Sequence, residues 1–167
     1  MYEAQHVHMQ RRVALKLLHR EQLAGPKGRE LRDRFLREAQ AAAAIDHPGI
    51  VQVYDSGVAG EDTFVAMELL QGEDLDSFLK REGTVGPGPA VAFVLRLLDV
   101  VGAAHRVGIV HRDLKPANIF LVNNADALTA FEERPLKLLD FGISKVRGAG
   151  IEKLTGTGMV MGTPHYM

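Results

Sequence analysis

The sequence predicts an α+β fold built in two parts. Strand-like runs and one helical segment fill the first 70 residues. A break rich in glycine and proline at residues 83–89 then separates them from a strongly apolar helical segment at residues 90–106. The chain has 167 residues, which is enough for one domain or two small lobes with a buried core. We therefore expect a sheet-bearing unit followed by the start of a mainly helical one.

The composition is ordinary for a soluble globular protein, with 46% apolar and 25% charged residues. A formal net charge of −1 gives no reason to expect nucleic acid or an anionic membrane as a partner. The sequence has no cysteine, which excludes disulfides and thiolate metal sites and fits a reducing compartment. We expect no bilayer-spanning run and no secretory leader. The segment is thus predicted to be cytoplasmic and without membrane contact.

The first part is predicted to contain four strands and one helix. Residues 2–18 have the pattern of two strands around a turn. Residues 29–45 are predicted to be helical, because apolar side chains recur at spacings of three and four, at Leu31, Phe35, Ala39 and Ala42. Two further strands are predicted at residues 50–54 and 63–69, joined by a turn that contains glycine.

The second part begins with the helix at residues 90–106. Its apolar stripe is predicted to consist of Val94, Leu97, Leu98, Val101 and Ala104. Short apolar runs at 119–122 and 136–139 are predicted to pair as strands on either side of a long polar loop. The stretch at residues 144–167 is rich in glycine and has little periodicity, so we expect a loop there.

One polar segment between the long helix and the next strand carries the chemistry, and it reads His111-Arg112-Asp113-Leu114-Lys115-Pro116-Ala117-Asn118. Pro116 excludes a regular helix, so these side chains project from a loop. The next apolar run ends in Asp140-Phe141-Gly142. Together these motifs resemble the catalytic domain of serine/threonine protein kinases, in particular the bacterial ones.

This resemblance implies a partial bilobal kinase fold. Residues 1–70 would form the small lobe, residues 71–82 the hinge and the helix after it, and residues 83–167 the start of the large lobe. The family's glycine-rich phosphate loop would precede this chain and its Ala-Pro-Glu motif would follow it. We therefore expect a domain truncated at both ends, and an isolated chain that is poorly active.

The activity implied is transfer of the γ-phosphoryl group of ATP to serine and threonine hydroxyls of protein substrates. The alternative is an inactive kinase fragment or pseudokinase that acts as a nucleotide-binding or interaction module. Pseudokinases usually lose the equivalents of Lys16, Asp113 or Asp140, and all three are present here. Their presence favours descent from an active enzyme.

Phosphoryl transfer requires an oriented acceptor hydroxyl, hard oxygen ligands for Mg²⁺ and neutralised phosphate charge. Asp113 can orient the hydroxyl or accept its proton. Asn118 and Asp140 offer one neutral and one anionic oxygen to the metal. Lys115 resembles the lysine that contacts the transferred phosphate in serine/threonine kinases.

Lys16 lies in an otherwise apolar strand, where an unpaired buried charge would be costly, so it needs an anion. Glu38 lies beside the apolar face of its predicted helix and needs a partner for the same reason. We expect the two to form an ion pair in the active protein, with Lys16 also reaching the ATP phosphates. The alternatives are a lysine that reaches solvent at the end of a strand and a solvated glutamate.

The run Met67-Glu68-Leu69-Leu70-Gln71-Gly72 resembles the hinge between the lobes. The resemblance implies that the backbone of Glu68 and Leu70 bonds the adenine edge and that Asp74 contacts the ribose. The full set of implied ATP-binding residues is Ala14, Lys16, Met67, Glu68, Leu70, Asp74 and Phe120. Phe120 replaces the family's usual leucine. For Met67 and Phe120, simple core packing explains the residue as well as ligand contact does.

The last segment resembles an activation loop, with Thr163 at the start of the part that faces the substrate. Thr155 and Thr157 lie where related bacterial kinases carry regulatory phosphothreonines, and Arg112 would receive that phosphate. Ordinary loop threonines are the alternative. His6 and His8 are interpreted as one exposed strand face and not as metal ligands, because no third ligand is near in the sequence.

Overall fold

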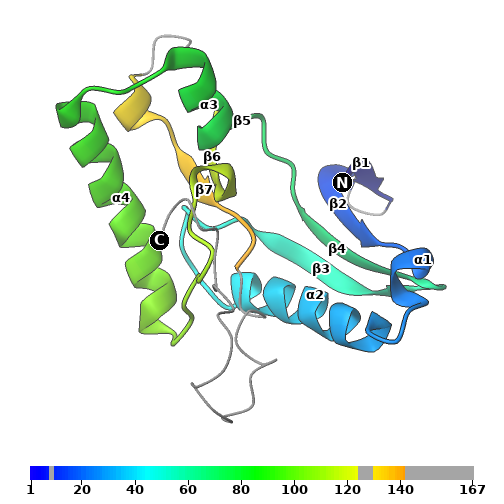
Figure 1. Cartoon of the computed structure of the whole chain (residues 1–167). Helices are drawn as coiled ribbons and strands as arrows, with labels where there is room; N and C mark the ends of the chain where they lie inside the picture. The colour runs from blue at the N-terminus through cyan, green and yellow to red at the C-terminus, as the bar shows by residue number, and fades with distance from the viewer. Residues whose placement is uncertain (8–9, 124–129, 142–167) are drawn as a thin grey trace.

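The computed structural model describes residues 1–7, 10–123 and 130–141. Figure 1 shows two parts. The first is a four-stranded sheet with helix α2 packed on it, and the second contains the long helix α4 and a smaller sheet. This arrangement is the two-part α+β fold that the sequence predicts. The predictions for His8, Gly142, Thr155, Thr157 and Thr163 concern residues outside the described ranges.

The first sheet is antiparallel and has the strand order β1-β2-β4-β3. Its members are β1 (Tyr2–His6), β2 (Arg11–Leu18), β3 (Val53–Ala59) and β4 (Asp62–Glu68). The two strands expected within residues 2–18 are confirmed as the β1–β2 hairpin. Strand β2 pairs with β4 from Val13↔Glu68 to Leu18↔Thr63. This register sets Ala14 opposite Met67 and Lys16 opposite Val65.

Helix α2 (Gly28–Ala43) packs on this sheet through Ala39 and Ala42, which are buried. It matches the helix predicted at 29–45. The sequence analysis missed α1 (Arg20–Leu23), a single turn in the linker before it. The side chain of Gln22 starts this turn by accepting the His19 backbone N–H at 3.0 Å. A turn of four residues is too short to leave a periodic apolar signal in the sequence.

The second sheet contains β5 (Gly72–Asp74), β6 (Ile119–Val122) and β7 (Leu136–Leu138), in the order β5-β6-β7. The predicted antiparallel pairing of the last two is confirmed. Strand β5, which was not predicted, joins this sheet directly after the hinge-like run. Its Gly72 has φ 149°, and a Cβ there would lie 2.0 Å from the Leu121 carbonyl oxygen. Only glycine fits so close an approach between backbones.

Two helices complete the second part, α3 (Leu75–Glu82) and α4 (Pro87–Arg106). Helix α4 begins at Pro87 and not at residue 90, because proline is compatible with the first helical turn. Its buried face consists of Phe93, Leu97, Val100, Ala103 and Ala104. The predicted stripe shares only part of this face, since Val94 is 47% exposed and Leu98 is 58% exposed.

Helix α4 also corrects the expectation that no segment could span a bilayer. By length and composition alone it could cross a membrane, since it has 20 residues and a mean hydropathy of 1.5 over an 18-residue window. Core helices of soluble proteins meet the same criterion, and α4 contributes its Phe93 face to the core of this fold. The helix is therefore weak evidence for a membrane span.

A short backbone junction connects the two parts between Gly49 and Val51. The Leu138 N–H donates to the Gly49 carbonyl at 2.7 Å, and the Val51 N–H donates to the Leu138 carbonyl at 3.3 Å. Ile50 and Leu138 thus form a parallel bridge. The strand predicted at 50–54 overlaps β3 only at residues 53–54, because the Ile50–Leu138 bridge and the bond from Val51 to β7 leave β3 to begin at Val53.

Candidate active site

The polar loop after α4 is built around His111, which is only 3% exposed. Its Nε2 lies 2.8 Å from the Leu139 carbonyl oxygen, so this nitrogen donates. Its Nδ1 lies 3.3 Å from the Asp113 backbone N–H and accepts from it. The imidazole ring also packs 4.8 Å from the ring of Phe141, measured between centroids. His111 therefore attaches the loop to the segment that carries Asp140.

Three polar side chains of this loop gather at one point. The Asn118 side-chain Nδ2 donates to the Asp113 backbone carbonyl at 2.7 Å and lies 3.2 Å from Asp113 Oδ2. The Lys115 Nζ lies 3.1 Å from the same carboxylate oxygen. Pro116 starts the short 3₁₀ turn Pro116–Asn118 that brings Asn118 back toward Asp113. The sequence-predicted residues Asp113, Lys115 and Asn118 are thus neighbours.

Two residues at this site have left-handed backbone conformations that residues other than glycine rarely adopt. Arg112 has φ 63° and Asp140 has φ 46°. Such conformations cost of order 1–3 kcal/mol each and are concentrated at functional sites in proteins. Both residues carry charge, and each belongs to one of the two kinase-like motifs, His111–Asn118 and Asp140–Gly142.

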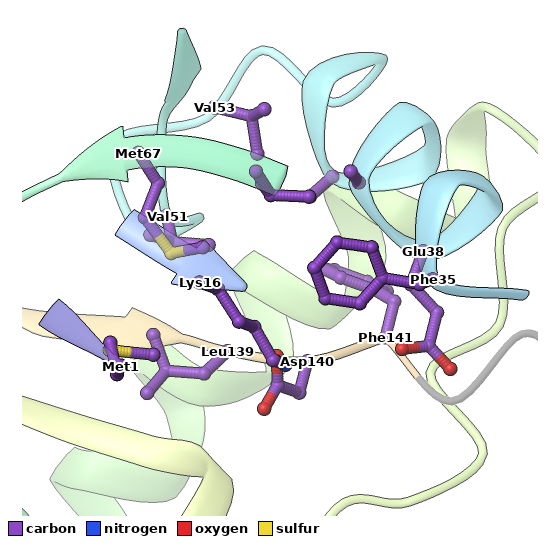
Figure 2. A pocket seen from close by; sticks show the side chains of 13 residues that line it. Met1, Lys16, Phe35, Glu38, Val51, Val53, Met67, Leu139, Asp140 and Phe141 are labelled. Atoms are coloured by element: carbon purple, nitrogen blue, oxygen red, sulfur yellow. The ribbon is translucent and has the colours of Figure 1, made fainter. Parts of the chain in front are cut away.

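Lys16 of β2 in the first part forms an ion pair with Asp140, which follows β7 in the second part. Its Nζ lies 2.6 Å from Asp140 Oδ1. Figure 2 shows the two side chains meeting, with Phe35 and Glu38 of α2 to one side of them. The Lys16 side chain is 30% exposed and that of Asp140 is 54% exposed, so solvent screens this pair in part.

Glu38 lines the same pocket as Lys16, and its carboxylate lies 3.6 Å from Arg34 Nε one turn earlier in α2. The ion pair that the structure shows for Lys16 is with Asp140, whereas the sequence analysis assigned Glu38 to it. That assignment was made for the active protein, and it stays a prediction.

The pocket between these residues is small and mainly apolar. Its cavity volume is about 50 Å³, comparable to one or two water molecules. Met67 lies at one wall and Asp140 at another, and the full lining is Met1, Lys16, Phe35, Glu38, Ala39, Ala42, Val51, Val53, Val65, Met67, Leu139, Asp140 and Phe141. Of the residues predicted for the site, Lys16, Glu38, Met67 and Asp140 therefore line one cavity.

Comparison with known proteins identifies the fold that holds these residues. The family model described as "Protein kinase domain" matches residues 1–167. The chain belongs to the protein kinase family. Its similarity to solved structures agrees with this assignment. The kinase domain of Mycobacterium tuberculosis PknI matches with a TM-score of 0.64 and 33% identity, over 85% of this chain and 54% of that one.

Curated relatives of this kinase chain are bacterial serine/threonine-protein kinases. It is 38% identical over 167 residues to PknH of M. tuberculosis and 36% identical over 168 residues to pkn2 of Myxococcus xanthus. It is 40% identical over 155 residues to PkaB of Streptomyces coelicolor, covering 93% of this chain. The other two alignments cover all of this chain. The chain spans 24%, 19% and 36% of these three relatives, in the order named.

The hinge-like run Met67–Gly72 begins within the last residues of β4, which ends at Glu68. The Glu68 backbone N–H donates to the Gln52 carbonyl at 2.9 Å, and its side chain accepts the Gln52 N–H at 2.7 Å. Lys137 of β7 places its Nζ 2.5 Å from the same Glu68 carboxylate oxygen and 3.2 Å from the Ile50 carbonyl. The end of β4 is thus bound to both the loop at Ile50 and the second sheet.

The sequence analysis did not predict a role for Lys137, although the signal was present. This lysine interrupts the apolar run Leu136-Lys137-Leu138 just as Lys16 interrupts β2. The argument that a lysine in an apolar strand needs an anion applied equally to it. The partner, Glu68, could not be read from the sequence because 69 positions separate the two residues.

The other residues expected at the nucleotide lie around the hinge. Ala14 is buried beside Met67 in the first sheet, and half-buried Phe120 faces Asp74 across the β5–β6 pair. Leu70 lies in the connection between β4 and β5. Asp74 caps α3, since its Oδ1 accepts the Ser77 N–H at 2.8 Å and its Oδ2 accepts the Ser77 hydroxyl at 2.9 Å. Burial raises the Asp74 pKa, but these hydrogen bonds outweigh burial and leave the pKa below its ordinary value.

The donor set at Asn118 and Asp140 suits Mg²⁺. Because the Asn118 amide nitrogen donates to Asp113, its amide oxygen remains available as a neutral ligand. The Leu139 N–H donates to the Asn118 carbonyl at 2.9 Å, which brings the strand before Asp140 alongside Asn118. Among the residues that the structure describes, no cluster of three or more His, Cys, Asp or Glu could hold a metal ion by itself. One neutral and one anionic oxygen suit Mg²⁺, which keeps water and phosphate oxygens among its ligands.

Proposed function

We propose that the protein containing this chain is a serine/threonine protein kinase that transfers the γ-phosphoryl group of ATP to protein substrates. The observation that carries the proposal is the grouping of Asp113, Lys115 and Asn118 within one loop, with the Lys16–Asp140 ion pair on the adjoining strand end. The serine/threonine class is supported by Lys115 and by the names of the relatives. We further propose that the protein acts in the cytoplasm.

Each residue has a role that its position supports. The Asp113 carboxylate orients the acceptor hydroxyl and accepts its proton, and Lys115 balances charge on the transferred group. Asn118 and Asp140 hold Mg²⁺ by their side-chain oxygens, and Lys16 binds the phosphates of ATP. When bound, Mg²⁺ neutralises the phosphate charge that develops during transfer.

The experiment is a phosphoryl-transfer assay with Mg·ATP on the full-length protein and its Asp113→Asn variant. We expect the variant to lose transfer and to keep nucleotide affinity within about twofold, because Asp113 faces the hydroxyl and not the nucleotide. Asp33→Asn, at an exposed carboxylate on α2, is the matched control and should behave as wild type. Undiminished transfer by the Asp113 variant would refute the assignment. Nucleotide binding without transfer in the wild type would favour the inactive-module alternative.

We also propose regulation by autophosphorylation of Thr155 or Thr157. Arg112 is exposed directly before Asp113, where a guanidinium can receive a phosphate through charge-assisted hydrogen bonds. Mass spectrometry of the active full-length protein should find phosphate on at least one of the two threonines. The Asp113→Asn protein should carry none. Phosphate on neither threonine of the active protein would contradict this regulation.

A further inference from the structure

The segment after the long polar loop inserts an aromatic ring between two helices. Phe131, in the short 3₁₀ turn Phe131–Glu133, stacks on Phe78 of α3 with ring centroids 4.9 Å apart and planes 17° apart. It also stacks on Phe93 of α4, with centroids 4.8 Å apart and planes 26° apart. Phe78 and Phe93 are both buried. The end of the long polar loop thus contributes the middle ring of a three-ring stack.

Arginine side chains fasten this segment to its surroundings. Arg96 of α4 donates to the backbone carbonyls of Glu132 and Arg134, the second at 3.0 Å. Arg134 in turn donates to the Leu121 carbonyl at 3.3 Å and to the Asn123 side-chain oxygen at 3.1 Å. The backbone directly after Phe131 is therefore bonded to α4 and to β6, and these bonds fix the position from which the Phe131 side chain extends.

Arg134 also reaches Glu73, which directly precedes the N-cap residue of α3. One oxygen of Glu73 accepts from Arg81 at 2.7 Å and from Arg134 at 3.3 Å. The guanidinium carbons of Arg81 and Arg134 lie 5.5 Å and 5.7 Å from the centre of the Phe78 ring. The hydrogen bond from Arg81 holds the pKa of Glu73 below its ordinary value, and Arg134 adds to this. Residues 131–134 therefore contact α3 at Phe78 and the preceding strand β5 at Glu73.

Helix α3 depends on contacts of this kind. It has eight residues, and a helix of that length is not stable in water without tertiary packing. Its first turn begins at Asp74, whose two carboxylate oxygens are both fixed by Ser77. A change in the position of Phe78 therefore moves the Asp74 carboxylate with the helix. Asp74 is the residue expected at the ribose of ATP.

We propose that Phe131 is a positioning residue for nucleotide binding. By holding Phe78, it fixes the first turn of α3 and so directs the Asp74 carboxylate at a ribose hydroxyl of the nucleotide. This inference rests on the proposed function, because it requires a nucleotide at the hinge. Neither the catalytic motifs nor the similarity to other kinases gives a role to this end of the long polar loop.

The test measures KM and kcat of the full-length protein with ATP, 2′-deoxy-ATP and 3′-deoxy-ATP. For Phe131→Ala we expect a rise in the KM for ATP of about two- to tenfold, the range for loss of aromatic pairing, with kcat changed less than about twofold. With the deoxynucleotide that lacks the contacted hydroxyl, the same substitution should change KM little. The substitution and the missing hydroxyl remove one and the same contact, so their effects should not add.

Two further variants separate positioning from general loss of stability. Phe131→Tyr keeps the stacked ring and should restore the KM for ATP. Phe64→Ala truncates a half-buried ring on β4 of the first sheet, away from α3, and any KM change should be equal for the three nucleotides. Equal KM changes for all three nucleotides in Phe131→Ala would overturn the inference, as would an unchanged KM for ATP.

Failure of the proposed function gives a different result. If the wild type binds nucleotide but transfers no phosphate, the same comparison is made from equilibrium dissociation constants of ADP and its 2′- and 3′-deoxy forms. Non-additive effects would then support the role of Phe131 although the kinase proposal had failed. A wild-type protein that binds none of these nucleotides would overturn both.

Discussion

Two lysines interrupt apolar strands in this chain, and each pairs with a carboxylate from a distant part of the sequence. Lys16 meets Asp140 at 2.6 Å, and Lys137 meets Glu68 at 2.5 Å. The second pair is the less solvated, with side chains 18% and 19% exposed. Screening by water is therefore weaker for Lys137 and Glu68, and removal of one partner should have the larger effect on stability there.

We predict that Lys137→Met destabilises the kinase fold by about 1–3 kcal/mol, because it leaves the Glu68 carboxylate half-buried without a cation. Urea unfolding of the full-length protein, followed by circular dichroism, measures the change. Lys137→Arg should recover most of the loss. The double variant with Glu68→Gln should be less destabilised than the sum of the single changes. Strictly additive effects would show that the contact contributes nothing.

At the scale of elements, the short helix α3 links stability to pH through its cap. The pKa of Asp74 in the folded protein is lower than its ordinary value, which is about 4 in an unfolded chain. A depressed carboxyl pKa contributes stability above the unfolded value, and this contribution disappears as pH falls through the folded value. The cap should therefore support the fold at neutral pH and lose its effect below about pH 4.

Asp74→Asn isolates this contribution, because asparagine keeps a capping oxygen but does not titrate there. We predict that the urea midpoint of the variant falls less steeply than that of the wild type as pH is lowered from about 5 to 3. Parallel pH profiles for Asp74→Asn and the wild type would rule out the cap as the titrating group.

The elements that the sequence predicts well are those whose signal is local. The hairpin at residues 2–18 and helix α2 follow from alternation and helical periodicity within their own segments. The start of β3 was wrong because Ile50 and Val51, although apolar, bond to β7 almost 90 positions later. The buried face of α4 was misjudged for a similar reason. Val94 and Leu98 are as apolar as Leu97, and only the packing partners decide which face is covered.

Within the candidate site, too, local features could be predicted from the sequence and contacts between distant segments could not. The grouping of Asp113, Lys115 and Asn118 lies within one loop of six residues, so the motif already implied it. The pairing of Lys16 with Asp140, in contrast, depends on how the two parts of the fold meet. The aromatic stack of Phe131 could not be predicted, because nothing in an isolated polar loop shows which of its side chains turns inward.

At the scale of the whole molecule, the outer face of α4 exposes a run of large apolar side chains. Val91, Val94, Leu95 and Leu98 are between 47% and 62% exposed along one helix. Apolar patches of this kind promote association. We predict that the isolated chain self-associates and that Leu95→Glu with Leu98→Glu reduces its association constant by at least about tenfold, as measured by sedimentation velocity.

The control for this prediction is Val58→Glu, which adds a charge at an exposed valine of β3 in the other part of the molecule. It should leave association unchanged within about twofold if the α4 face is the contact surface. Equal reduction by Val58→Glu would indicate a general effect of net charge. A chain that is monomeric without substitution would contradict the prediction directly.

The backbone junction at Ile50 also restricts the position of Asp140. Leu138, which makes both backbone hydrogen bonds of the junction, precedes Asp140 by only two residues. Two residues span at most about 7 Å even when fully extended, so Asp140 stays within that reach of the junction. Gly49 and Val51 belong to the connection that leads from α2 into β3. A shift of the first part that keeps these hydrogen bonds intact therefore carries Asp140 with it.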